Sequence, residues 1–517
     1  MKKDIFILAA LSFLLFFLKI GLIPILDGDT AFYATIAKNI VKSGNWLTLN
    51  FINPKDIIDK PPLFMWITAA SFKLFGINEF ALSFFHSFLA FGCVVFTYLL
   101  GKDSYNKQVG LWAGIILATS AQFFYIARTP MLDIPLTFFI TGALYFLYKT
   151  EKSNLFYYPA ALFCALALLT KGPIGVFIPA AAFTIYLIVN KKFSALINLH
   201  VFLAAILFFA VSIPWFAIEY KILGQKFLDI FFLRNTFRFL HPTDVIGELK
   251  SAVPQYDFYS YFLQIFILFA PWSGFVYPSI ANSIKKKGNY FLLIWAAVAF
   301  LIFAFSLNYK LGRYILPAFP PLAILASALI YEGDKRYMRS SAWFNAVLVA
   351  PLLVIGTIFL IIKFPREQAG FRPIILPFIT IFTVGLVSGT ALLFKNQVNL
   401  AIRIFAAFSA ASYIVFISAG SLFLNQALPI KSFCLKLNVL AKPNDIIIKY
   451  GGDEPRQEHF YLNKPPLFTR DKSEINKALS SGKKCFIITQ DNSFKNLKIM
   501  EASNGYFLFS WLKLAPK

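Results

Sequence analysis

Long apolar stretches constrain this chain more than any other feature. Between Ile5 and Ser421 there are about thirteen of them, and a helix of about 20 mainly apolar residues crosses a bilayer. Of the 517 residues, 58% are hydrophobic and 14% are charged, whereas soluble chains average about 45–50% apolar and about 25% charged residues. The sequence therefore predicts a polytopic all-α membrane protein.

The expected spans differ in length, and their ends are set by polar or charged residues. They cover residues 5–26, 80–100, 109–127, 134–148, 155–169, 174–189, 199–218, 259–280, 290–306, 314–331, 343–362, 374–394 and 400–421. The first begins after Met1-Lys2-Lys3-Asp4, as a signal peptide does, but it is too long and no small-residue cleavage site follows. We expect it to be a retained membrane helix.

Basic residues on alternate short loops predict the orientation. They place one side in the cytoplasm by the positive-inside rule, and an odd number of spans then leaves the N-terminus inside and the C-terminal segment outside. The long loops 27–79 and 219–258 fall on the outer side. The expected location is the inner (plasma) membrane, with multiple passes and contact with membrane lipids.

The composition changes near residue 425, which predicts two domains, 1–425 in the membrane and 426–517 outside it. Short strands are expected at 445–450 and 484–490, with a helix at 473–480 between them. This pattern is typical of a small extracytoplasmic α/β domain. Cys434 and Cys485 lie in it and could form a disulfide, although no spacing signature supports one.

Several function classes find no support. The net charge is +24, but the basic residues are scattered over short loops, which argues against a nucleic-acid partner. The four histidines lack metal-ligand spacing, so no metal site is predicted. No cofactor is required by the sequence, and a divalent cation is unsupported. A P-loop and a Gly-x-Ser-x-Gly elbow are both absent.

Unusual polar residues gather on the predicted outer side, where ionisable groups at a membrane suggest function. Asp27-Gly28-Asp29 follows the first span, and a helix is expected to begin near Thr30. Asp29 would then cap that helix, a structural role that is compatible with a catalytic one. Asp59-Lys60 begins the next apolar stretch; Lys60 suits either lipid headgroups or a bound phosphate.

Four further outer segments carry charges that fit an anionic ligand or a structural role. Arg128 and Asp133 close one short turn, where they could pair with each other or contact a ligand. Lys171 in the next turn suits an interface anchor equally well. Arg234 and Arg238 are four residues apart, so on a helix they would share a face that suits phosphate or lipid headgroups. The last cluster contains Lys310, Arg313 and Tyr314.

In their order and spacing these motifs resemble the GT-C-fold glycosyltransferases that use polyprenyl-phosphate sugars. The branch in question contains the bacterial lipid A 4-amino-4-deoxy-L-arabinose transferases and, more distantly, the protein O-mannosyltransferases. The resemblance extends over the membrane part and is weak in the C-terminal domain. It rests on Asp27–Tyr33, Asp59–Pro62, Arg128–Asp133, Leu169–Pro173, Arg238-Phe239 and Lys310–Pro317.

The resemblance implies roles for these residues. Asp29 matches the acidic residue at the reaction centre, and Lys60 and Arg238 match basic residues that contact the donor phosphate, where we also place Lys310. Thr30 stands where the family usually has a second acidic residue after the first-loop Asp. Asp27 is the alternative residue for the role of that second carboxylate. The expected substrate cavity is lined by Asp27, Tyr33, Asp59, Arg128, Asp133, Lys171, Arg234, Arg313 and Tyr314.

The predicted enzyme moves a hexose or pentose, with inversion, from a polyprenyl-phosphate carrier to an acceptor on the outer face. Lipid A or another envelope glycolipid is the expected acceptor, and a protein is the alternative. A non-enzymatic alternative is a lipid-carrier transporter or flippase. It predicts polar residues near mid-membrane, whereas here they cluster at one interface.

Overall fold

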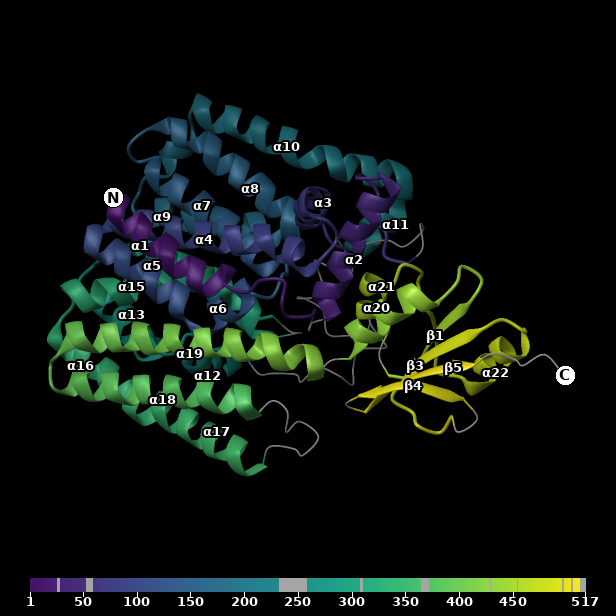
Figure 1. Ribbon diagram of the computed structural model, residues 1–517. Coiled ribbons are helices and arrows are strands. Elements are labelled where there is room, and N and C mark those ends of the chain that lie inside the picture. The colour runs from purple at the N-terminus through teal and green to yellow at the C-terminus, as the bar shows by residue number, and fades with distance from the viewer. Residues whose placement is uncertain are drawn as a thin grey trace.

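The computed structural model describes residues 1–25, 28–52, 59–231, 258–306, 310–363, 372–427, 429–452, 454–494, 497–503 and 505–511. Helices form one large bundle, and a smaller part with a sheet lies at one end of it (Figure 1). The predicted class, a polytopic helical membrane protein with a small C-terminal α/β part, is confirmed. The division at residue 425 stays a prediction.

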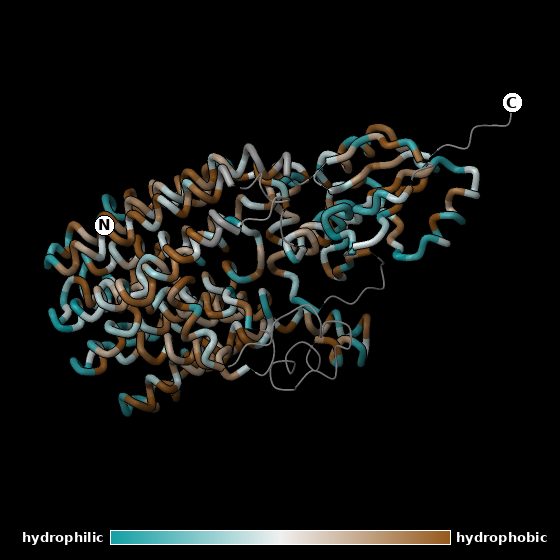
Figure 2. The backbone as a smooth tube through the Cα atoms, turned by 90° about the horizontal axis from the view of Figure 1, so that it is seen from below, coloured by the Kyte–Doolittle hydropathy of each residue, from teal (hydrophilic) through white to brown (hydrophobic). Residues whose placement is uncertain are grey.

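The bundle is built from helices whose faces are mainly apolar. Figure 2 shows hydrophobic residues along the helices and hydrophilic residues at their ends and in the C-terminal part. Its members are α1 (Lys2–Ser12), α4 (Glu79–Ser104), α5 (Lys107–Thr119), α6 (Ala121–Ala127), α7 (Asp133–Lys149), α8 (Tyr157–Lys171), α9 (Ile174–Val189), α10 (Leu199–Leu223), α11 (Gln225–Leu228), α12 (Ser260–Leu268), α13 (Val276–Lys285), α14 (Tyr290–Ala304), α15 (Phe319–Glu332), α16 (Lys335–Phe344), α17 (Ala350–Lys363), α18 (Arg372–Phe394) and α19 (Val398–Ala427).

Among the described residues, seven helices are long and apolar enough to cross a membrane, or eight if α5 and α6, bent by 67°, count as one. Helices α9 and α14 are apolar but shorter. The expected count of thirteen therefore stays a prediction. One expected span, 259–280, is broken: α12 ends at Leu268, a 3₁₀ turn follows at Ser273–Phe275, and α13 begins at Val276.

The first helix ends earlier than predicted. Helix α1 continues as a π-helical turn, Phe13–Phe17, and not to Leu26, because Leu18 leaves the helical conformation with ψ 123°. Gly21 then adopts a positive φ of 82°. A Cβ there would lie 2.8 Å from the backbone of Phe80, so only glycine fits this turn.

The C-terminal part contains a mixed five-stranded sheet in the order β2-β1-β3-β5-β4. Strand β1 is parallel to β2 and β3, and β5 is antiparallel to β3 and β4. The expected strands 445–450 and 484–490 and the helix 473–480 are present within one residue, as β1, β3 and α22. The elements are β1 (Ile446–Tyr450), β2 (Leu467–Thr469), β3 (Cys485–Thr489), β4 (Lys498–Ser503), β5 (Tyr506–Trp511), α20 (Ile430–Leu440), α21 (Arg456–Tyr461) and α22 (Lys472–Ser480).

Two helices after the first span join the bundle to the sheet. Helices α2 (Gly28–Ser43) and α3 (Leu63–Phe75) share one buried apolar cluster with α20, α21 and the sheet. Phe72 of α3, for example, lies against Phe460 of α21, with ring centroids 6.1 Å apart. Cys434 packs in this cluster and Cys485 in another, and both thiols are free, so the possible disulfide is not formed.

Candidate active site

Asp29 occupies the first turn of α2, because the helix begins at Gly28, two residues earlier than expected. It therefore does not precede the helix as a cap. One carboxylate oxygen of Asp29 lies 2.7 Å from a guanidinium nitrogen of Arg313, and the other lies 3.3 Å from Arg456. Two cations from distant parts of the chain thus converge on this carboxylate.

Asp133 connects two of the predicted cations. It is the first residue of α7 and is 4% exposed. Its carboxylate accepts a hydrogen bond of 2.6 Å from Lys171, the last residue of α8, and lies 3.7 Å from Nε of Arg313. The Lys171 ammonium is also 4.7 Å from the ring centre of Tyr314. Arg313 therefore bridges Asp29 and Asp133.

Tyr33 marks the place where the acidic residues meet. It faces inward from α2 and is 7% exposed. Burial raises the pKa of this phenol well above its usual value, and the negative charges of Asp29, Asp59 and Asp133 raise the pKa further, whereas Arg313 lowers it. Three carboxylates from three segments are thus near one buried hydroxyl, which stays protonated at physiological pH.

The two remaining predicted lysines are also buried. Lys60 is 8% exposed, and its ammonium donates a hydrogen bond of 2.7 Å to Asp59. Lys310 is 6% exposed and precedes the 3₁₀ turn Gly312–Ala318, which carries Arg313 and Tyr314. A buried cation needs a partner, and the Asp59 carboxylate provides one for Lys60.

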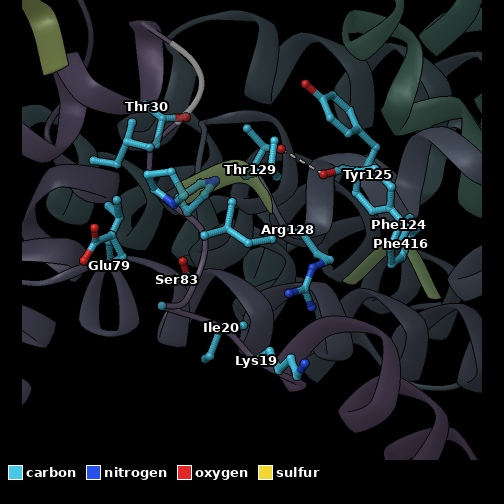
Figure 3. Close-up of a pocket in the computed structure, with 17 residues that line it drawn as sticks. Lys19, Ile20, Thr30, Glu79, Ser83, Phe124, Tyr125, Arg128, Thr129 and Phe416 are labelled. Atoms are coloured by element: carbon cyan, nitrogen blue, oxygen red, sulfur yellow. Dashed lines mark hydrogen bonds between the residues drawn. The ribbon is translucent and has the colours of Figure 1, made fainter. Parts of the chain in front are cut away.

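The pairing of Arg128 with Asp133, one of the two possibilities that the sequence left open, is not formed. The Arg128 guanidinium donates hydrogen bonds of 3.0 to 3.2 Å to the carbonyls of Leu15, Phe16 and Leu18, where the first helix ends. It also lines a pocket, shown in Figure 3. Lys19, Thr30 and Glu79 are among the pocket's other polar residues.

Three predicted site residues, Asp27, Arg234 and Arg238, lie outside the described residues. In the described part of the site, four cations pair with three carboxylates, Asp29, Asp59 and Asp133, which leaves this group with a net positive charge. The cations are Lys60, Lys171, Arg313 and Arg456. In the part of the chain that the structure describes, no group of three His, Cys, Asp or Glu side chains is arranged to hold a metal ion.

Sequence reasoning missed the contribution of the C-terminal part. Arg456 at the start of α21 reaches Asp29, and Lys38 of α2 donates to the carbonyls of His459, Phe460 and Leu462. No motif in the sequence marks these contacts. The only local signal is an Arg at the start of a short amphipathic segment, which is common on protein surfaces.

Known proteins resemble this chain in sequence and in fold. A family model described as "Dolichyl-phosphate-mannose-protein mannosyltransferase" matches residues 59–218. An uncharacterized protein of Aquifex aeolicus (strain VF5) is 30% identical, over 72% of each chain. The "Undecaprenyl phosphate-alpha-4-amino-4-deoxy-L-arabinose arabinosyl transferase 1" of Proteus mirabilis (strain HI4320) is 29% identical, over 63% of this chain and 60% of its own length.

The fold agrees with these matches over nearly the whole chain. The crystal structure of ArnT from Cupriavidus metallidurans bound to undecaprenyl phosphate superimposes with a TM-score of 0.80, at 16% identity, and covers 98% of this chain and 97% of that one. The C-terminal part is included in this match. The chain therefore belongs to the GT-C-fold glycosyltransferases of the ArnT type, multi-pass inner-membrane enzymes that use a polyprenyl-phosphate-linked donor.

Proposed function

We propose that this enzyme transfers a sugar, with inversion, from a polyprenyl-phosphate carrier to a phosphate or hydroxyl group of an envelope glycolipid on the outer face of the membrane. The observation that carries the proposal is the chain of contacts from Asp29 through Arg313 and Asp133 to Lys171. It joins α2, α7, α8 and the turn Gly312–Ala318 at one end of the bundle.

The positive charge of the site suits the departure of a lipid phosphate. As the bond between the anomeric carbon and the phosphate oxygen breaks, its electron pair passes to the phosphate. Preorganised cations in a site of low dielectric stabilise that charge. Lys60 and Lys310 are the buried cations that we assign to this task, with Arg238 as a further candidate from the family resemblance.

Asp29 acts on the other side of the reacting carbon. If the acceptor is a hydroxyl group, its oxygen bonds to the anomeric carbon and its proton passes to Asp29. If the acceptor is a phosphate, no proton moves, and the carboxylate stabilises positive charge at the anomeric carbon. Asp133 holds Lys171 and Arg313 in place in either case.

The charge at the helix ends supports the outer face as the side of the reaction. The site residues begin α2 and α7 and end α8, whereas the opposite ends of these and neighbouring helices carry Lys102, Lys107, Lys149 and Lys285. Positive loops favour the cytoplasmic side. The outer face is consequently the side that we propose for the reaction.

The test compares the envelope glycolipids of host cells with and without the chain by mass spectrometry. Loss of one sugar-modified glycolipid, and its return with the wild-type chain, is the expected result. Asp29→Asn should fail to restore it. Asp103→Asn is the control, because Asp103 pairs with Lys149 at the opposite end of the bundle.

Full restoration by Asp29→Asn would overturn the assignment of Asp29. A change in glycoproteins without a change in glycolipids would overturn the proposed acceptor in favour of a protein. Proteoliposomes that separate sugar transfer from movement of the carrier address the flippase alternative: carrier movement without transfer would refute the proposed reaction.

A further inference from the structure

Arg456 comes from the C-terminal part but reaches the centre of the site. It is the first residue of α21, which packs beside α2 (Figure 1). Its guanidinium lies 3.3 Å from Asp29, and its Cζ is 5.8 Å from the ring centre of Phe32. The Cδ of Arg456 also lies near the backbone of Gly28. It thus packs against the short segment of α2 that carries the proposed catalytic acid.

The two guanidinium groups hold Asp29 unequally. Arg313 approaches to 2.7 Å and its side chain is 19% exposed, whereas Arg456 remains at 3.3 Å and is 40% exposed. Exposed ion pairs contribute little net free energy, because water competes for both charges. Arg456 is therefore the partner that Asp29 loses most easily.

The backbone that carries Arg456 is held firmly in place. The buried Lys38 ammonium donates three hydrogen bonds, of 3.0, 2.7 and 2.6 Å, to backbone carbonyls of the α21 segment. The hydroxyl of Tyr461 donates to the Glu79 carboxylate at 3.0 Å. The helix is thus fixed to the first outer loop, while the half-exposed Arg456 side chain at its start can still change partners.

We propose that a substrate phosphate replaces Asp29 as the partner of Arg456. This inference rests on the proposed function. A guanidinium group forms paired hydrogen bonds with phosphate oxygens, so a phosphate offers Arg456 a better partner than the single Asp29 oxygen 3.3 Å away. The exchange also releases Asp29 from Arg456 at the moment when substrate is present. The phosphate belongs to either the carrier lipid or the acceptor glycolipid.

The test measures binding of two probes to the full chain in nanodiscs by native mass spectrometry. The probes are undecaprenyl phosphate and a bisphosphorylated lipid A, each added alone. Arg456→Gln should weaken binding of one probe about tenfold, as expected for the loss of a charge-assisted contact, and Arg456→Lys should retain most of the affinity. The probe that is affected identifies the source of the phosphate.

A second pair of variants tests the exchange itself. In Asp29→Asn the competing carboxylate is gone, so Arg456 should bind the phosphate several-fold more tightly. The double variant Asp29→Asn with Arg456→Gln should show no such gain. A purely structural role for Arg456 would not produce this dependence. Hydrogen exchange of the α21 amides verifies that each variant keeps the helix docked.

Arg470 provides the matched control. It is an exposed arginine of the same part of the chain, which donates to the carbonyl of Gly452 and lies 5.6 Å from the ring of Phe468. Arg470→Gln should bind both probes as the wild type does. The proposal would be overturned if Arg456→Gln bound both probes as the wild type does. It would also be overturned if Asp29→Asn increased the affinity equally with and without the Arg456→Gln substitution.

Binding requires no turnover, so the result is independent of the proposed reaction. A chain that binds undecaprenyl phosphate through Arg456 but transfers no sugar would refute the proposed function and support this inference. If the wild-type chain transfers sugar and Arg456→Gln leaves the phosphate affinity unchanged, the proposed function is supported and this inference is refuted.

Discussion

Asp133 and Lys171 are 38 positions apart in the sequence, yet the carboxylate and the ammonium form a hydrogen bond of 2.6 Å. The pair joins the first residue of α7 to the last residue of α8. Because Arg313 also approaches Asp133, this single buried carboxylate keeps two cations close together. Their mutual repulsion would otherwise separate them.

Asp133→Asn should therefore lower the rate of sugar transfer about 100-fold, since misplacing charged groups of an active site costs roughly this much. The neutral amide can no longer balance Lys171 and Arg313, and both side chains should move. Steady-state kinetics of sugar transfer in proteoliposomes measure the effect, with circular dichroism to verify the helical fold.

Glu151→Gln is the control for this variant. Glu151 pairs with Lys192 at 2.8 Å, but its side chain is 36% exposed and that of Lys192 is 55% exposed. Removing one charge of an exposed pair costs only about 0.2–1 kcal/mol, so transfer should continue at the wild-type rate. Equal activities of the two variants would contradict the role given to Asp133.

Local pattern predicted several elements well because apolar runs and turn residues define them. Helix α9 has the expected bounds, 174–189, and the strands β1 and β3 were found from short β-branched runs. The first span was extended wrongly from residue 17 to residue 26, because the apolar run continues there. Steric contact of Gly21 with Phe80, which is remote in sequence, is part of what shapes the turn.

Most members of the site were predictable from the sequence, but their pairing was not. The sequence indicated Asp29, Lys60, Asp133 and Lys171 as candidates, but it left open which cation meets which acid. Arg128 and Asp133 are five residues apart and do not pair, because the bend at the first helix places three carbonyls around Arg128. Arg456 reaches Asp29 only because α21 packs against α2, and no local sequence pattern encodes that packing.

Arg128 should contribute to stability rather than to substrate affinity. Replacement by Gln removes donors from carbonyls of Leu15, Phe16 and Leu18, and each buried acceptor without a partner costs about 1–3 kcal/mol. We expect a lower melting temperature with the KM for the donor unchanged. Arg339→Gln, at an exposed position of α16, is the control. A raised KM without a change in melting temperature would instead assign Arg128 to the substrate.

Lys38 should be essential for docking of the C-terminal part. The residue is 5% exposed, and burial lowers the pKa of its ammonium to about 8, so the group is still mainly protonated at pH 7. Lys38→Met leaves three carbonyls without this donor, at a cost of about 3 kcal/mol or more. Hydrogen exchange should show loss of protection at residues 456–462.

Lys464→Met tests whether any lysine that binds carbonyls has this effect. Lys464 donates hydrogen bonds of 2.9 Å to the carbonyls of Pro443 and Asp445, but both partners lie in the C-terminal part with it, and the lysine is exposed. Protection of α21 should be unaffected. Comparable loss in both variants would show that the Lys38 contacts are not specific to docking.

Acid should weaken the docking of α21 through His459. This side chain is 8% exposed, with its ring 5.2 Å from that of Phe51, and burial, followed by the nearby Lys38 charge, lowers its pKa to about 4. Between pH 6.5 and pH 4 the undocked state binds more protons than the docked state. Stability therefore rises with pH in this window and is lost on acidification. From pH 7 to pH 5 the loss is about 2 kcal/mol.

His459→Gln removes the titrating group but keeps the backbone carbonyl that accepts from Lys38. The variant should thus lose less protection of the α21 amides between pH 7 and pH 5 than the wild type does, after correction for intrinsic exchange rates. Every other ionisable group is present in both proteins, so the difference between the two pH profiles isolates His459. Parallel profiles would show that protonation of His459 does not oppose docking.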